Sequence, residues 1–332
     1  MQHALRKNCW CVGAQRAKED CVNHIKSWVS AFSICLVGAC AVSPHSESID
    51  DSSLISEGEG AVIYGTDNRR DVYTETNATL RTFVQRSIVA MVSNDAFISV
   101  SAAGVRLRGN GTYGEQNGLC SGERFSNHPA IASCSGTLVG PDLVLTAGHC
   151  VENGGCVNNR WVFNYSLASA TSLTVMKAND VYTCKRVEKQ FRDDNGSDYA
   201  VVRLDRTVSA DKTPARVRQA STSSLKAGQA LVMAGSPAGL PTKITDGAKV
   251  LSVSPRGYFE TNLDAFAGNS GSGVFDPATL ELVGILVRGN NDFALDRTRG
   301  CNVAQTCVAG SPSRATGCVL AGEQVSFPPT GL

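Results

Sequence analysis

Short apolar runs separated by turn-forming residues constrain the fold of this chain more than any other feature. Valine, leucine and isoleucine recur in brief segments such as SIVAMV (87–92), DLVLTA (142–147), DYAVVRLD (198–205) and LVGILVRG (282–289). No long stretch has the periodicity of an amphipathic helix, and 32 glycines supply the tight turns that short strands need. We therefore expect an all-β protein built as a sandwich or as barrels, with strands or turns also over residues 61–80.

Composition and charge narrow the class of partner. The chain of 332 residues is 42% hydrophobic, which is enough for a substantial core. Its formal net charge is only +1, and basic and acidic residues alternate along the chain. Because no large field of one sign is expected, nucleic acid and anionic membrane surfaces are not predicted partners.

The cysteines indicate an oxidising compartment. Of the 13 cysteines, five precede residue 41, and the other eight are Cys120, Cys134, Cys150, Cys156, Cys184, Cys301, Cys307 and Cys318. An even number allows all eight to pair in an exported protein. The alternative is a cytosolic protein with buried thiols or a zinc site, but the chain contains no Cys-x-x-Cys pair. We expect no metal site.

The N-terminus has the pattern of an export signal. Residues 27–43, SWVSAFSICLVGACAVS, form an apolar run that is too short to span a bilayer stably and that ends in small residues. We assign residues 1–40 to a signal peptide or lipoprotein leader and the polar residues 41–60 to a linker or propeptide. VGAC (37–40) resembles a bacterial lipobox, which would place a lipid anchor on Cys40; cleavage near Ala41 is the alternative. No membrane helix is expected after the leader.

Three segments carry residues suited to nucleophilic catalysis. In chain order they are LTAGHC with His149, GSDYAVVRLD with Asp198, and AFAGNSGSG with Ser270. A serine hydroxyl needs a neutral imidazole to take its proton, and the imidazole needs a carboxylate to fix its tautomer. Once the leader is removed, only His45, His128 and His149 remain, and the first two lie beside prolines in polar surroundings.

The serine segment gives the strongest signal of the three. Glycines on both sides of the Asn-Ser pair permit a tight turn in which the N–H groups of Gly268 and Ser270 point together at a developing oxyanion. A flexible Gly/Ser linker is the alternative, but apolar runs follow at once. Asp198 opens an apolar strand, where a turn-capping role is its alternative.

These three segments, read as TAGHC, DYAVVRLD and GNSGSGVF, resemble those of trypsin-like serine proteases, especially the bacterial branch that includes the glutamyl endopeptidases. VIYGTDNRRDVY (62–73) is similar to the start of the mature region in that branch. The resemblance covers roughly residues 61–290. It implies the chymotrypsin-like fold of two six-stranded antiparallel β-barrels with the active site between them.

The resemblance also implies a division of the chain and a disulfide. We assign residues 61–190 to an N-terminal barrel carrying His149 and residues 191–332 to a C-terminal barrel carrying Ser270, with Asp198 at the boundary. Cys134 and Cys150 occupy the positions of a family disulfide. Cys156 fits Cys184 in the same barrel, and the cluster of Cys301, Cys307 and Cys318 requires one partner from outside it, for which we expect Cys120.

Substrate preference is predicted from the same resemblance. Asp264 stands six residues before the nucleophile, where trypsin-like enzymes place the base of the primary pocket, so we expect Arg or Lys at P1; a turn-capping aspartate is the alternative. Val287 and Gly289 are expected to contact substrate, and Arg288 to bias a neighbouring subsite. Glutamate-specific relatives place a histidine where this chain has Leu286. Animal trypsins carry an aspartate immediately before the nucleophile, where this chain has Asn269.

Together these observations predict an exported serine endopeptidase that acts through an acyl-enzyme. We expect a cofactor-independent monomer, secreted, periplasmic or held in the cell envelope, that acts on protein or peptide substrates and meets a membrane only through the anchor at Cys40. Glutamyl specificity and an inactive, protease-like binding module are the alternatives. An α/β-hydrolase is excluded, because it requires the order Ser, Asp, His and a Gly-x-Ser-x-Gly turn.

Overall fold

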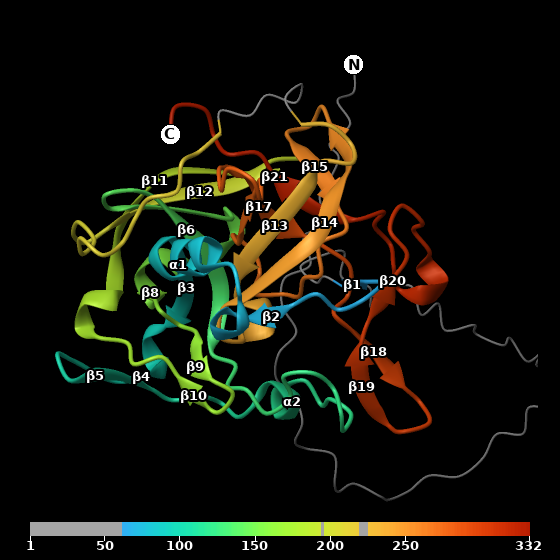
Figure 1. The fold of residues 1–332 in the computed structure, drawn as a ribbon, viewed down its shortest axis with the longest axis horizontal. Helices are drawn as coiled ribbons and strands as arrows, with labels where there is room; N and C mark the ends of the chain where they lie inside the picture. The colour runs from blue at the N-terminus through green and yellow to red at the C-terminus, as the bar shows by residue number, and fades with distance from the viewer. Residues whose placement is uncertain (1–61, 194–195, 219–224) are drawn as a thin grey trace, which may run out of the picture. The chain divides into compact units, whose positions relative to one another are not determined.

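A computed structural model describes residues 62–193, 196–218 and 225–332 (Figure 1). The predicted leader, the anchor at Cys40 and the linker 41–60 lie outside the described residues.

The first barrel is closed by six antiparallel strands. In the order of their hydrogen bonding they are β11 (Val181–Arg192), β12 (Asp198–Leu204), β7 (Leu143–Thr146), β6 (Ala132–Gly140), β3 (Ile88–Ser93) and β8 (Asn159–Phe163), which returns to β11. Strand β12 is apolar where both of its faces are covered, at the buried residues Ala200, Val201 and Val202. The pairing of Ala200 with Thr146 places the start of β12 beside the end of β7.

The second barrel also has six strands, with a seventh attached. Its strands are β13 (Ala230–Gly235), β16 (Gly273–Phe275), β17 (Leu282–Arg288), β21 (Glu323–Ser326), β15 (Tyr258–Thr261) and β14 (Lys243–Ser254), and β13 pairs with β14 to close the ring. The short β2 (Arg70–Asp71) adds to β14. The prediction of an all-β protein with two six-stranded antiparallel barrels is confirmed.

A continuous apolar core joins the barrels. Val144 and Leu145 of the first barrel belong to the same buried cluster as Val232, Phe275 and Ile285 of the second. In Figure 1 the green strands of the first barrel run directly beside the orange strands of the second. Segments that lie far apart in the sequence can therefore meet in a fixed geometry at this junction.

Shorter strands form four separate pairs. They are β1 (Ile63–Tyr64) with β20 (Thr306–Cys307), β4 (Phe97–Ser101) with β5 (Gly104–Leu107), β9 (Leu167–Ser169) with β10 (Ser172–Leu173), and β18 (Phe293–Asp296) with β19 (Cys301–Ala304). Only β1 and β20 run parallel. This pair fixes the start of the described chain against its C-terminal region.

The expectation of strands or turns over residues 61–80 is wrong at its end. Helix α1 (Ala78–Ser87) begins there, and α2 (Tyr113–Gln116) and α3 (Gly155–Asn158) are single turns. Asn77 caps α1, since its Oδ1 accepts from the N–H groups of Thr79 (3.0 Å) and Leu80 (3.2 Å). Leu80 and Val84, one helical turn apart, are buried and anchor the helix.

The strand pairing gives the N-terminal barrel other bounds than the predicted residues 61 and 190. Its last strand, β12, ends at Leu204 rather than at residue 190, because it pairs with β11 on one side and β7 on the other. Asp198 thus starts a strand of the first barrel. At the other end, β1 and β2 pair with β20 and β14, so residues 62–71 belong with the C-terminal part of the chain.

Four disulfides use all eight cysteines of the described part of the chain. They are Cys120–Cys301, Cys134–Cys150, Cys156–Cys184 and Cys307–Cys318. Each predicted pairing is confirmed, including the partner from outside the C-terminal cluster. The Cys120–Cys301 disulfide ties the β18–β19 hairpin to the loop that follows α2.

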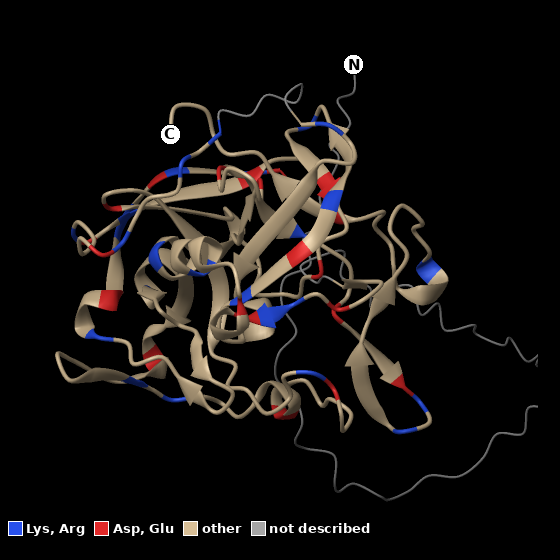
Figure 2. Cartoon of the chain, viewed as in Figure 1, with Lys and Arg blue, Asp and Glu red and all other residues tan. Residues whose placement is uncertain are grey.

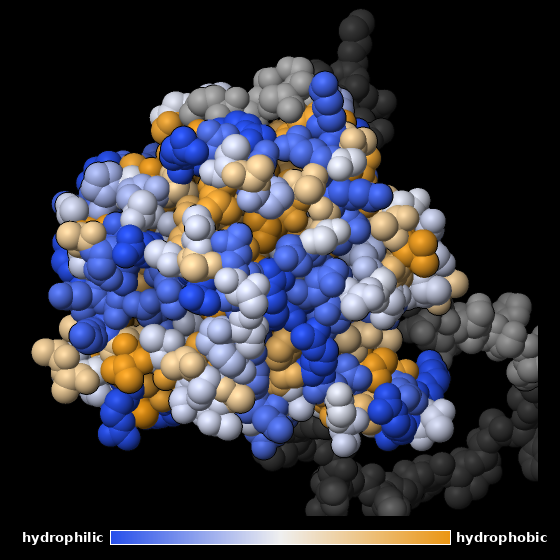
Figure 3. Space-filling view, viewed as in Figure 1, coloured by the Kyte–Doolittle hydropathy of each residue, from blue (hydrophilic) through white to orange (hydrophobic). Residues whose placement is uncertain are grey.

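The surface carries charges of both signs and scattered apolar groups. Figure 2 shows basic and acidic residues interspersed over the strands and loops, and Figure 3 shows hydrophilic and hydrophobic side chains mixed across one face. Within the described ranges, none of the helices has the length and apolar character to cross a bilayer.

Candidate active site

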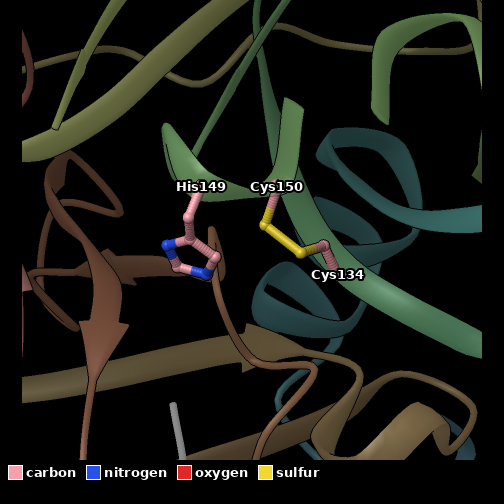
Figure 4. A group of neighbouring side chains, drawn as sticks. All are labelled: Cys134, His149 and Cys150. Atoms are coloured by element: carbon pink, nitrogen blue, oxygen red, sulfur yellow. A yellow bond between two sulfur atoms is a disulfide. The ribbon is translucent and has the colours of Figure 1, made fainter. Parts of the chain in front are cut away.

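His149 lies where the first barrel faces the second. β7 ends at Thr146, and after Ala147 and Gly148 the chain enters a 3₁₀ turn, His149–Val151. The disulfide between Cys150 and Cys134 fixes this turn to β6, as Figure 4 shows. The two sulfurs and the imidazole lie close together, but sulfurs joined in a disulfide cannot act as thiolate ligands, so these residues do not form a metal site.

Asp198 is buried beneath the imidazole, and both of its oxygens accept hydrogen bonds. Its Oδ2 lies 2.6 Å from His149 Nδ1, and its Oδ1 accepts from the N–H groups of Gly148 (2.6 Å) and His149 (3.2 Å). A Cβ at Gly148 would lie 2.7 Å from Asp198 Oδ1, so only glycine allows this approach. The carboxylate therefore fixes both the turn and the ring, and leaves Nε2 as the nitrogen that can accept a proton.

The Ser270 turn is held against the first barrel by its main chain. The Ser270 carbonyl oxygen accepts from the N–H of Ser135 (2.8 Å) and lies 3.7 Å from Cys150 Sγ. Gly268 adopts φ +87°, and a Cβ there would lie 2.8 Å from the carbonyl oxygen of Ser236. Glycine at this position permits the left-handed conformation and the close packing of the turn.

The structure brings His149 and Asp198 into contact and places the Ser270 main chain beside them. Over the described residues, no hydrogen bond joins Ser270 Oγ to His149 Nε2, so of the predicted triad only His149 and Asp198 are in contact here. In the same part of the chain, neither the N–H of Gly268 nor that of Ser270 donates a hydrogen bond within the protein. Both predicted oxyanion donors are therefore available.

Asp264 is buried, and both of its carboxylate oxygens accept hydrogen bonds from the segment 62–71. Its Oδ1 accepts from the N–H of Tyr64 and its Oδ2 from the N–H of Asn68, both at 2.7 Å. Burial raises the pKa of Asp264 to about 6, although these two N–H groups oppose the rise. This arrangement matches the alternative stated above, a capping aspartate, more closely than an open carboxylate at the base of a pocket.

The other predicted substrate-binding residues lie at the end of β17. Val287 is buried in the core shared by the barrels, so only its main chain can meet a substrate there. Gly289 follows the strand and is also buried. Arg288 turns its guanidinium to the carbonyl of Gly196 (2.9 Å) and to Gln324 Oε1 (3.1 Å), which ties β17 to the loop before Asp198.

Three supporting residues had no sequence signal that singled them out. Ser135 Oγ donates to the Gly268 carbonyl (2.8 Å) and accepts from the Ser236 N–H (2.9 Å). Thr146 Oγ1 donates to the Ser135 carbonyl (2.7 Å), and Ser326 Oγ accepts from the N–H of Asp198 (3.1 Å). Ser135 and Ser326 thus connect the two barrels behind the site, and Thr146 joins β7 to β6 within the first barrel.

Comparisons with known proteins find a family model and a similar solved structure. Residues 134–285 match a family model described as "Trypsin-like peptidase domain". Among solved structures, "Structure of Glu endopeptidase in complex with MPD" is similar, with a TM-score of 0.42 and 19% identity over 73% of this chain and 91% of that chain. No curated protein matches the chain at a significant level.

Proposed function

Since this chain is a trypsin-like serine protease, we propose that it is an exported endopeptidase whose catalytic residues are Ser270, His149 and Asp198. The observation that carries the assignment is the 2.6 Å contact between His149 Nδ1 and Asp198 Oδ2, directly behind a Ser270 turn whose two N–H groups are available. This arrangement supports acyl transfer because it supplies a base, its orienting carboxylate and an oxyanion site.

The proposed reaction follows from these positions. His149 Nε2 takes the hydroxyl proton as Ser270 Oγ attacks the carbonyl carbon, and the N–H groups of Gly268 and Ser270 stabilise the oxyanion. The imidazolium then gives its proton to the leaving amine, which leaves an acyl-enzyme on Ser270. A water molecule, deprotonated by the same imidazole, hydrolyses the ester. Every step uses side chains and main-chain N–H groups of this chain.

A preference for Arg or Lys at P1, through Asp264, is the finer part of the proposal. The two N–H groups on its oxygens argue against an open charged pocket, and Leu286 leaves glutamate specificity without its usual histidine. Export is supported by the four disulfides, which persist in oxidising compartments. We propose a secreted or envelope-bound monomer, anchored through Cys40 if the leader is processed as a lipoprotein.

A positional peptide library, assayed with wild type and Ser270→Ala, tests the function and the preference together. We expect cleavage and fluorophosphonate labelling in wild type, and loss of both in Ser270→Ala. Activity that survives in Ser270→Ala would exclude Ser270 as the nucleophile, and cleavage after Glu would exclude the role of Asp264. A wild-type protein that neither cleaves nor labels would instead be the inactive binding module.

A further inference from the structure

One peptide unit of the loop before the nucleophile is partly exposed. Between Leu263 and Ser270, only Ala267 and Gly268 are not fully buried. The trans peptide between these two residues carries the Ala267 carbonyl and the Gly268 N–H, which is one of the two proposed oxyanion donors. Because a trans peptide is planar, its C=O and its N–H point in opposite directions. The direction of the Gly268 N–H therefore depends on what binds Ala267.

Ala267 is bound from two sides. Its carbonyl accepts from the N–H of Ala238, in the turn that follows β13. Its N–H donates to both side-chain oxygens of Asp292, each at 3.0 Å. A hydrogen bond to a carboxylate is stronger than one between two neutral main-chain groups. The bond to Asp292 is thus the stronger of the two contacts.

The contact from Ala238 comes from a strained residue. Ala238 has φ +46° and ψ +36°, in the left-handed region that a residue with a Cβ rarely adopts. The turn is kept in this conformation by two donors on the Gly239 carbonyl, the Ile131 N–H (2.8 Å) and the Tyr165 hydroxyl (3.0 Å). Since the strain opposes the Ala238 contact, the orientation of the Ala267 peptide depends mainly on Asp292.

Asp292 is itself anchored outside the nucleophile loop. Its carbonyl accepts from the N–H of Gln305 (2.9 Å), and it directly precedes β18, whose hairpin with β19 is tied by a disulfide to the loop after α2. The ring of the next residue, Phe293, lies 5.3 Å from that of Phe266, centroid to centroid. The carboxylate therefore has a fixed position beside the loop.

We propose that Asp292 is a positioning residue: by binding the Ala267 N–H it orients the Ala267–Gly268 peptide so that the Gly268 N–H points at the developing oxyanion. The oxyanion forms as Ser270 Oγ adds to the substrate carbonyl carbon, and it is stabilised best by donors that are already aimed at it. Without the carboxylate, Ala267 keeps only the strained contact, and the peptide can rotate. This inference rests on the proposed function.

The test compares Asp292→Ala and Asp292→Asn with wild type on the best library peptide. In Asp292→Ala we expect kcat and the rate of fluorophosphonate labelling to fall by about 10²-fold, the effect of losing one oxyanion donor, with little change in KM. Asp292→Asn keeps an acceptor oxygen for the Ala267 N–H and should lose about tenfold at most. Thermal unfolding shows that each variant folds.

Asp296→Ala, at the end of β18, is the matched control. The Asp296 carboxylate also accepts from main-chain N–H groups, those of Thr298 (2.9 Å) and Arg299 (3.0 Å). This variant should keep the kcat and the labelling rate of wild type. An unchanged kcat in Asp292→Ala, or an equal loss in Asp296→Ala, would overturn the inference.

A peptide aldehyde separates positioning from a role in folding or in substrate contact. Ser270 Oγ adds to its carbonyl carbon, the hydroxyl proton passes to His149, and the adduct carries an oxyanion; the corresponding peptide alcohol binds without an adduct. In Asp292→Ala the affinity for the aldehyde should fall by the same factor as kcat/KM, while the affinity for the alcohol and the P1 preference stay. Equal losses for both ligands, or a loss confined to one class of P1 residue, would show that Asp292 acts on substrate binding instead.

Hydrogen exchange tests the contact without activity. Loss of the Asp292 carboxylate should speed exchange of the Ala267 amide by about tenfold or more in Asp292→Ala, and Asp296→Ala should match wild type. Unchanged exchange in Asp292→Ala would contradict the proposed hold on the loop. Faster exchange in a protein whose wild type neither cleaves nor labels would instead support that hold and overturn the proposed function.

Discussion

The two barrels bury carboxyl groups near the reactive turn and satisfy them differently. In the first barrel, Asp198 accepts three hydrogen bonds, two from main-chain N–H groups and one from the imidazole. In the second, Glu323 has one side-chain donor on Oε1, and within the described residues Oε2 has no partner of ordinary geometry. The Asp198 carboxylate has donors on both oxygens, whereas within the described residues the Glu323 carboxyl has one on Oε1 alone.

The largest effect is expected when the charge of Asp198, the buried carboxylate of the first barrel, is removed. In Asp198→Asn the side-chain oxygen can still accept from Gly148, but its amide cannot accept the Nδ1 hydrogen, so the imidazole adopts the wrong tautomer. We expect kcat to fall by about 10⁴-fold with little change in KM or Tm. Steady-state kinetics and thermal unfolding measure both. Asp193→Asn, in the loop before β12, is the control, and a loss below about tenfold in Asp198→Asn would contradict the assigned role.

A smaller effect is expected where the two barrels meet behind the site. Ser135→Ala removes one group that serves both the Gly268 carbonyl and the Ser236 N–H, and leaves these buried groups unpaired. Each unpaired group costs about 1–3 kcal/mol, so we expect a lower free energy of unfolding and a fall in kcat of about tenfold as the oxyanion turn loosens. KM should change little.

Ser133→Ala is the matched control for this variant. Ser133 lies two residues away on the same strand, is exposed, and donates only to the Met91 carbonyl (3.3 Å). It should retain both stability and kcat. If Ser135→Ala loses stability but keeps its full kcat, Ser135 supports the fold without positioning the turn.

The sequence predicted the strands and the three proposed catalytic residues because both have strong local signals. Apolar runs such as DLVLTA are buried on both faces, and the order of His149, Asp198 and Ser270 with their flanking glycines is specific. Cys134–Cys150 followed from the family position and Cys156–Cys184 from its place in one barrel, whereas the sequence left open which of the three C-terminal cysteines pairs with Cys120. Helix α1 was missed because its cap, Asn77, stands in a polar stretch with the composition of a turn.

The remaining features depend on tertiary contacts that no local pattern encodes. Ser135 and Ser326 are single hydroxyls beside apolar residues, and their roles arise only where β6 and β21 meet loops from distant parts of the chain. Asp264 shows the same limit: its position relative to Ser270 predicted a pocket residue, but the segment carrying Tyr64 and Asn68 folds over it and occupies both oxygens. In these cases the role of the residue was decided by contacts between segments far apart in the sequence, and not by local propensity.

The pH dependence of stability sharpens the comparison through Asp264, with the smallest expected effect. Its pKa in the folded chain, about 6, lies above the ordinary value of about 4, so folding favours the protonated form. The stability it contributes is full below pH about 4 and is lost as the pH rises through about 6.

Asn does not titrate, so the free energy of unfolding of wild type minus that of Asp264→Asn should fall with rising pH, by at most about 1.4 kcal/mol per pH unit. Urea denaturation between about pH 4 and pH 7 measures this difference. Asp276→Asn is the control: the hydrogen bond from Arg218 lowers the pKa of Asp276, so the stability that this carboxylate contributes is lost only below about pH 4, and the corresponding difference should stay flat across this window. A difference that grows with pH for Asp264 would mean that the two N–H groups outweigh burial, and that the carboxylate is charged where the N-terminal segment meets the second barrel.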